Sequence, residues 1–333
     1  MKSEIGVTFA AQDGLITRRQ ASGYLSDAEL RGLLGRFWRV VLPGVYADSP
    51  GEITWRQRVR AALLYAGDGA MLADATGLRA YRAAYLPADH FVRVLVADNV
   101  QRPSRDFVVL RRTTRLPVPV MIGGLPVVPM DRALCEFVAR HADERESFAV
   151  AAAAVQTGRV KLGQIVDEAE RGPARGRPRL VRTIASLSRG VRSLPERDFM
   201  DLADRSKVLP SLLYNCLIQL PDGQRLRPDA LAADAALIHE TNGRRFHAPE
   251  EEGGDDDLFE QTQWRADVLT AAGFTVLGNA PKRIRSQGPQ VIGMFEECYL
   301  RDRGRGLPDG VTILRTGPGD TDTDVTSLRR KAS

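Results

Sequence analysis

The sequence predicts a multidomain chain of the α+β or α/β class. With 333 residues, the chain exceeds the usual size of a single domain. Its hydrophobic content of 43% and charged content of 27% are ordinary for a globular protein. Segments with helical periodicity alternate with segments rich in β-branched residues, and Gly/Pro-rich breaks separate them. This mixture predicts a mixed α/β middle domain and a C-terminal mixed sheet flanked by helices.

Composition changes along the chain predict where its domains begin and end. A turn-rich run at residues 47–51 and a basic Gly/Pro-rich stretch beginning at Arg171 interrupt the apolar periodicity. Beyond Gly317 that periodicity is absent, which favours a disordered tail. The predicted divisions are a winged helix-turn-helix at 1–50, a mixed α/β middle domain at 51–170, a basic connector and helix at 171–191, a mixed sheet flanked by helices at 192–315, and a disordered tail at 316–333.

Charge and cysteine content limit the classes of partner and compartment. A net charge of +5 permits binding to phosphate backbones without requiring it. The longest apolar run, residues 148–155, is too short to span a bilayer. The three cysteines lack the spacing of a disulfide framework or a zinc site. We therefore expect a cytoplasmic protein without membrane contact.

The first fifty or so residues have the layout of a winged helix-turn-helix. Thr17 is a good N-cap for a short helix, and Ser26 with Glu29 fits a capping box that begins a second helix. Helical spacing of apolar residues predicts a buried face that extends to Phe37, and residues 38–46 alternate as a short hairpin would. In this motif the second helix enters the major groove of DNA. The predicted phosphate contacts are Arg31, Arg36 and Arg39.

An alternative interpretation of this motif is a module that contacts protein. Asp27 and Glu29 would repel phosphate unless they face away from it. DNA binding remains the favoured interpretation. Residues 14–21 (GLITRRQA) and 42–46 (LPGVY) resemble the N-terminal domain of AbiEi-family antitoxins from type IV toxin–antitoxin systems. Residues 124–134 (GLPVVPMDRAL) are similar to the second domain of that family. The resemblance implies a winged helix that binds double-stranded DNA and regulates its own operon, and it makes a cognate toxin a candidate partner.

Two carboxylates in the last third of the chain indicate a metal site. Asp229 follows Arg227 and Pro228 within one apolar run, and Glu240 ends the next apolar run. Two strands joined by a tight turn would bring these carboxylates side by side, as a hard divalent cation requires. A helix predicted to begin near residue 193 would bring Glu196 to the same place.

The segment from residue 192 resembles the very-short-patch-repair-like branch of the PD-(D/E)xK endonucleases. It is particularly similar to actinobacterial proteins that join this domain to an AbiEi-type N-terminus. The matching residues are Glu196, Arg227, Pro228, Asp229, Glu240, Thr241, Asn242, Gly243, Arg244, His247, Arg265 and residues 271–274. The resemblance implies a restriction-endonuclease-like sheet with Mg²⁺ on Asp229 and Glu240. It also implies that Glu196 positions the metal or a water and that His247 acts as an acid or base. The predicted phosphate contacts of this segment are Arg244, Arg245 and Arg265.

Asn242 is where the sequence departs from the endonuclease pattern. The pattern has lysine at this position, and many related sequences have aspartate, whereas an amide neither carries positive charge nor accepts a proton at neutral pH. Asn242 can still orient a water, so it completes the candidate catalytic set. Two functions stay open: a DNA-binding regulator whose nuclease-fold domain cleaves DNA with Mg²⁺, and a non-enzymatic DNA-binding antitoxin or repressor with a decayed nuclease domain.

Overall fold

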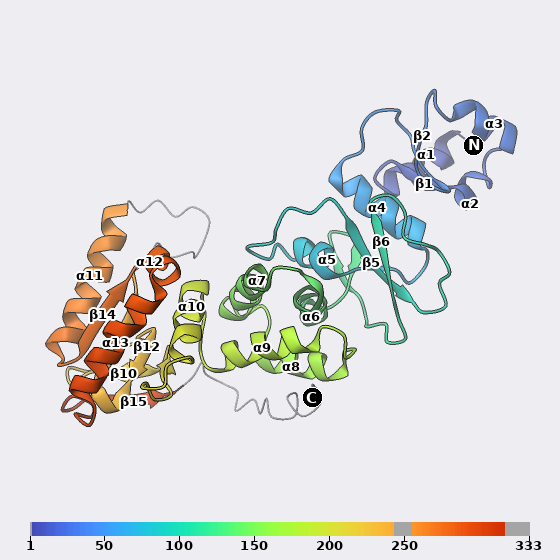
Figure 1. The fold of residues 1–333 in the computed structure, drawn as a ribbon. Helices are drawn as coiled ribbons and strands as arrows, with labels where there is room; N and C mark the ends of the chain where they lie inside the picture. The colour runs from blue at the N-terminus through green and yellow to red at the C-terminus, as the bar shows by residue number, and fades with distance from the viewer. Residues whose placement is uncertain (1, 243–254, 317–333) are drawn as a thin grey trace. The chain divides into compact units, whose positions relative to one another are not determined.

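The computed structural model describes residues 2–242 and 255–316. The chain divides into two compact units, Met1–Ala142 and Asp143–Ser333, and each is described by itself below. Both units mix helices with small sheets (Figure 1), which confirms the multidomain α+β class. The composition breaks near residues 50 and 170 do not coincide with the division between the units. Residues 143–170 belong to the second unit, where Glu144 receives hydrogen bonds from Arg182 and Arg145 pairs with Asp198.

The first unit begins with helices around a three-stranded antiparallel sheet of order β1-β3-β2. The capping boxes predicted at Thr17 and Ser26 are both present. Phe9, Trp38 and Tyr46 belong to the core that joins the helices to this sheet, and the Phe9 and Trp38 rings meet edge to face. The elements are α1 (Lys2–Ala11), β1 (Leu15–Thr17), α2 (Arg18–Ala21), α3 (Asp27–Leu33), β2 (Arg39–Leu42) and β3 (Val45–Ala47).

Helix α3 is shorter than the apolar spacing predicts. It ends at Leu33, Leu34 is extended, and Gly35 has a φ of 79° in the left-handed region that ends helices. The predicted buried face therefore does not reach Phe37, whose exposed fraction is 51%. Helix α1 was not predicted, because its residues have little amphipathic periodicity.

The rest of the first unit is a five-stranded mixed sheet of order β6-β5-β4-β8-β7 with helices. Thr54 caps α4, and Asp13 ties α4 to the N-terminal elements through ion pairs with Arg56 and Arg60. The elements are α4 (Trp55–Ala66), β4 (Met71–Leu72), α5 (Asp74–Ala80), β5 (Val92–Ala97), β6 (Val108–Thr113), β7 (Val120–Ile122), β8 (Leu125–Val127) and α6 (Met130–Arg140).

The second unit places four helices before two small sheets. These helices are α7 (Glu144–Gln156), α8 (Leu162–Arg171), α9 (Arg177–Ser188) and α10 (Leu194–Ala203). The sheet orders are β14-β13-β12-β9 and β11-β10-β15, with β13 and β14 parallel. The remaining elements are β9 (Leu213–Tyr214), β10 (Leu217–Gln219), β11 (Arg225–Leu226), β12 (Ala230–Ala232), a 3-10 turn (Ala233–Ala235), β13 (Leu237–Thr241), α11 (Asp255–Ala271), β14 (Thr275–Asn279), α12 (Pro281–Ser286), α13 (Gly288–Asp302) and β15 (Thr312–Arg315).

The strands of this unit are more divided than the sequence predicts. The apolar run at 212–220 forms two strands in different sheets, because Asn215 has a φ of 49° and turns the chain between them. The run at 226–231 is likewise split into β11 and β12 by residues 227–229. The turn predicted at residues 221–223 does join β10 to β11. No helix within the described residues is both long and apolar enough to cross a membrane.

Candidate carboxylate site

Strand register places Asp229 and Glu240 at the same end of the larger sheet. Ala230 of β12 pairs with His239 of β13, so the residues next to them, Asp229 and Glu240, are also neighbours. Oδ2 of Asp229 accepts a hydrogen bond from the backbone N–H of Thr241 at 2.7 Å. The proximity that the sequence predicts for these two residues is therefore present, although Asp229 lies just before β12 and not within it.

Glu196 reaches the same region from the first turn of α10. Its Oε2 accepts hydrogen bonds from the backbone N–H of Arg192 at 2.9 Å and from Nδ2 of Asn215 at 2.6 Å. Its Oε1 accepts a hydrogen bond from the hydroxyl of Ser193, the N-cap residue, at 2.7 Å. These donors fix the carboxylate of Glu196 in one orientation.

The three carboxylates interact electrostatically, with Asp229 as the common neighbour. Burial, followed by the charge of Asp229, raises the pKa of Glu196 to about 7 and the pKa of Glu240 to about 8. Burial also raises the pKa of Asp229, although the N–H of Thr241 and the charge of Arg265 oppose that shift. Crowded carboxylates with raised pKa values are favourable for cation binding, because a bound cation removes the repulsion between them.

Arg265 of α11 already balances part of this negative charge. Its Nη2 donates to Oε1 of Glu240 at 3.2 Å and to the backbone carbonyl of Arg227. The sequence predicted a phosphate contact for Arg265, whereas the structure pairs this guanidinium with a carboxylate of the chain itself. Arg265 therefore aligns Glu240 and competes with any cation for the same oxygen.

Asn242 lies at the edge of the site, above Gly278 of β14. Its backbone N–H donates to the carbonyl of Asn279 at 2.9 Å. Its exposed side chain covers Gly278 so closely that a Cβ at that position would lie 3.0 Å from Cγ of Asn242 and would collide with Nδ2. The close approach of Asn242 thus depends on a glycine in the neighbouring strand.

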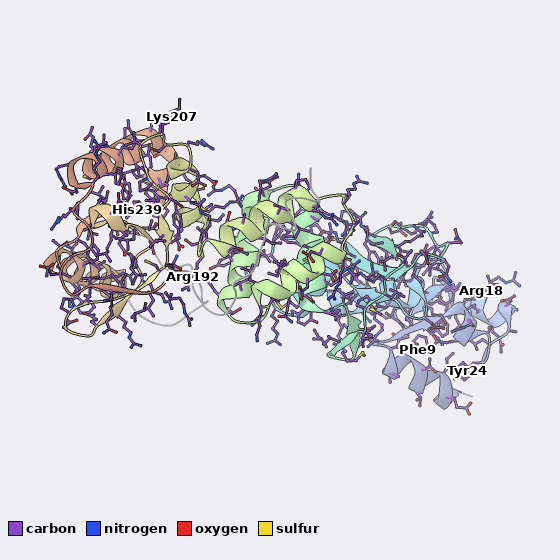
Figure 2. All side chains as sticks on the ribbon, turned by 90° about the horizontal axis from the view of Figure 1, so that it is seen from below. Phe9, Arg18, Tyr24, Arg192, Lys207 and His239 are labelled. Atoms are coloured by element: carbon purple, nitrogen blue, oxygen red, sulfur yellow. The ribbon has the colours of Figure 1, made fainter. Side chains whose placement is uncertain are left out.

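His239 occupies the opposite side of β13, because side chains alternate along a strand. His239, which is labelled in Figure 2, is 1% exposed and stacks on Phe199 of α10 with ring centroids 3.6 Å apart. Neither ring nitrogen has a hydrogen-bond partner within the described residues, and burial lowers the pKa of His239 to about 3. A neutral, stacked histidine thus supports β13 behind Glu240.

The carboxylate oxygens of the site are ligands of the kind that a hard metal ion prefers, although they are few. Among the side chains that the structure describes, which exclude those of residues 1–3, 243–262 and 317–333, no group of three or more His, Cys, Asp or Glu is arranged to hold a metal. The remaining candidate ligands are Asp229 and Glu240, whose oxygens match the preference of Mg²⁺ for few protein ligands and several waters. The predicted residues Arg244, Arg245 and His247 lie outside the described residues.

The predicted DNA contacts of the first unit lie on and after α3. Arg31 is exposed on α3 and donates from Nε to the carbonyl of Asp27 at 3.1 Å. Arg36 stacks over the exposed ring of Phe37, and Arg39 of β2 donates to the carbonyl of Gly51 at 3.1 Å. All three guanidinium groups belong to exposed residues and carry no ion pair within the described part of the chain.

Two residues of the second unit, Asn215 and Arg192, were not predicted as part of the site. Asn215 holds Glu196, and Arg192 supplies a backbone N–H to the same carboxylate. Asparagine is enriched among residues with left-handed φ, but its position inside an apolar run concealed this signal.

Comparison with known proteins adds little to this geometry. No family model matches the chain. No curated protein matches it either. Among solved structures, the RV2827C protein from Mycobacterium tuberculosis is 17% identical, with a TM-score of 0.39 over 54% of this chain and 75% of that chain. A likeness this low carries no argument about fold or function, so the candidate site must be judged on its own residues.

Proposed function

We propose that this protein binds double-stranded DNA through its first unit and hydrolyses phosphodiester bonds at the carboxylate site of its second unit, with Mg²⁺ as cofactor. The observation that carries this proposal is the pairing of Asp229 with Glu240 at the end of β12 and β13. Both carboxyl groups have raised pKa values in the metal-free chain, so a divalent cation would find a site that gains from binding it.

The residues of the site divide the work of hydrolysis between them. Asp229 and Glu240 would hold Mg²⁺, which supplies a water of lowered pKa and stabilises charge on the phosphate. Glu196 is held by three donors and is suited to orient a water beside Asp229. Arg265 keeps Glu240 aligned from α11.

DNA binding by the first unit is supported by the order of its elements and by local charge pairing. The order helix, strand, helix, helix and hairpin is that of a winged helix, with α3 as the recognition helix. The acidic residues of α3 are engaged locally: Asp27 pairs with Arg18 at 3.2 Å, and Glu29 accepts from the N–H of Ser26 at 2.8 Å. Together with the AbiEi resemblance, this favours a DNA-binding regulator, for which a cognate toxin is a proposed partner.

A second candidate function is a non-enzymatic DNA-binding antitoxin or repressor with a decayed nuclease domain. The contact between Arg265 and Glu240 favours it, because the guanidinium already supplies positive charge where a metal would bind. Asn242 favours it too, since no lysine stands beside the carboxylates in the described residues of β13.

Cleavage and metal binding by the full chain separate these two functions. Labelled duplex DNA is incubated with Mg²⁺ or with a chelator, and thermal unfolding is followed in parallel samples without DNA. For the nuclease function we expect Mg²⁺-dependent cleavage, and a Mg²⁺-dependent rise in Tm because the ion binds only the native state. Both should be lost in Glu240→Gln, which keeps the shape of the side chain. Wild-type protein that binds DNA but shows neither effect would establish the repressor function.

A further inference from the structure

Two arginines of the second unit lie on the Glu196 side of the carboxylate site. Arg192 comes just before the N-cap of α10, and Arg227 comes two residues before Asp229. Nη1 of Arg227 donates to the backbone carbonyl of Asn215 at 3.0 Å. Asn215 in turn donates a hydrogen bond from Nδ2 to Oε2 of Glu196. The same oxygen accepts a hydrogen bond from the backbone N–H of Arg192. A continuous chain of contacts therefore brings the backbone of Arg192 and the side chain of Arg227 to the same small region.

The guanidinium groups of this arginine pair, Arg192 and Arg227, have no ion-pair partner within 4.0 Å in the described residues. Both residues are half-buried, and neither forms an ion pair within the described residues. The Arg192 guanidinium makes no hydrogen bond there, and Arg227 uses a single Nη1. Burial and the nearby charge of Arg227 lower the pKa of Arg192, while the charges of Glu196 and Asp229 oppose that shift.

The carboxylates beside the arginine pair compensate it only partly. Glu196 already accepts hydrogen bonds from three donors of the chain, and near neutral pH it is partly protonated because its pKa is about 7. Asp229 directs Oδ2 to Thr241. Two half-buried cations with unused N–H donors would therefore be stabilised by an anion, and arginine binds phosphate oxygens with two parallel hydrogen bonds.

We propose that Arg192 and Arg227 form a phosphate-binding subsite beside Asp229, which holds the phosphodiester group presented to the carboxylate site. The identity of the anion as a nucleic-acid phosphodiester rests on the proposed function, whereas the binding of a phosphate group rests on the arginine pair alone. Arg192 forms no ion pair with Glu196 within 4.0 Å in the described residues, so its guanidinium is not held by that neighbouring carboxylate.

Inorganic phosphate is the probe that tests this subsite. Thermal unfolding of the full chain is measured without Mg²⁺ over a phosphate series, with sodium chloride added to keep the ionic strength constant. We expect phosphate to raise the Tm of wild-type protein, and the apparent phosphate affinity to fall at least tenfold in Arg192→Gln and in Arg227→Gln. Arg225→Gln is the matched control, because Arg225 is exposed on β11 and lies two residues from Arg227.

Lysine variants distinguish loss of the subsite from loss of folding. Arg192→Lys and Arg227→Lys keep the positive charge, so they should fold like wild type and keep part of the phosphate affinity. Equal phosphate affinity in Arg192→Gln and Arg225→Gln, or no phosphate effect in wild type, would overturn the inference.

The carboxylate variant separates this inference from the proposed function. Glu240→Gln should abolish cleavage while it leaves phosphate binding intact, since Glu240 is not in contact with the arginine pair in the described structure. If phosphate binding depends on the arginine pair but the wild-type protein cleaves no DNA, the proposed hydrolysis is wrong and the phosphate-binding subsite stands. If Arg192→Gln still cleaves DNA with the same KM as wild type, the subsite inference is wrong and the proposed hydrolysis stands.

Discussion

Asn215 and Glu196 are joined by a hydrogen bond of 2.6 Å from Nδ2 to Oε2. The same amide donates to the carbonyl of Gly190 at 3.1 Å, and the backbone N–H of Asn215 donates to the carbonyl of Asp229 at 3.2 Å. One residue thus links the start of α10 to the segment that carries Asp229. Its φ of 49° lies in the left-handed region, which asparagine tolerates better than most residues.

Replacing this amide by a carboxylate should disturb the site through charge. Asn215→Asp keeps the size of the side chain but turns a donor toward Glu196 into an acceptor. At pH 8 we expect the free energy of unfolding to fall by about 2–3 kcal/mol, because the hydrogen bond is lost and two buried acceptors face each other. The loss should shrink at pH 5, where one of the two carboxyl groups is protonated. Urea denaturation at both pH values measures this, with Asn215→Gly as the uncharged control. Equal losses in the two variants at both pH values would contradict it.

The proximity of Asp229 and Glu240 was predictable, whereas the turn at Asn215 was not. Two apolar runs separated by a short break lead to an antiparallel pair whose far ends lie close together, although the turn fixes the register that puts both side chains on one face. The apolar run at 212–220 carries strand-forming residues throughout, so local propensity predicts one strand. Its division depends on the hydrogen bonds of Asn215 to Gly190 and Asp229, which are tertiary contacts.

The end of α3 and the partner of Arg265 illustrate the same limit. Gly35 marks the helix end in the sequence, but the helical spacing of Leu33, Leu34 and Phe37 concealed it. Arg265 was assigned to phosphate because arginine commonly binds phosphate. Its contact with Glu240 depends on how α11 packs beside β13, which no local pattern encodes.

His239 should make the stability of the second unit depend on pH. Folding lowers the pKa of this histidine from 6.5 to about 3, so the native state favours its neutral form. Its contribution is complete above pH 6.5 and is lost as the pH falls toward 3. Relative to His239→Phe, wild-type protein should lose about 2 kcal/mol between pH 7 and pH 5.

The comparison with His239→Phe is needed because Glu196 and Glu240 change the stability of the folded protein with pH in the opposite direction to His239. The pKa values of Glu196 and Glu240 are raised on folding, so their contribution is complete below about pH 4.5 and is lost as the pH rises through 7 to 8. Denaturation curves of both proteins over this range give the difference. A difference that does not change with pH would show that His239 is charged or exposed in the native state.

Gly278→Ala should displace Asn242 at little cost in stability. The new Cβ would collide with the end of an exposed side chain, which can rotate away, so we expect a change below about 1 kcal/mol. If Asn242 orients a water for hydrolysis, Gly278→Ala and Asn242→Ala should lower kcat by similar factors, and the double variant should lower it no further. Gly293→Ala in α13 is the control, because nothing lies within 4 Å of a Cβ there. Additive effects of the two substitutions on kcat would exclude a shared role.

Salt dependence should identify the DNA contacts of the first unit. Each arginine that neutralises a phosphate releases a counterion, so its loss lowers the slope of log affinity against log salt by about 0.9. Arg31→Ala, Arg36→Ala and Arg39→Ala should each produce this change in the full chain, measured by fluorescence anisotropy on duplex DNA over several salt concentrations. Arg105→Ala removes the same charge from an arginine that pairs with Asp106 at 3.7 Å, so it should leave the slope unchanged. Binding of DNA by the winged-helix mode requires the exposed arginines of α3 and the β2–β3 hairpin. Equal slopes in all four variants would therefore place the DNA-binding surface elsewhere.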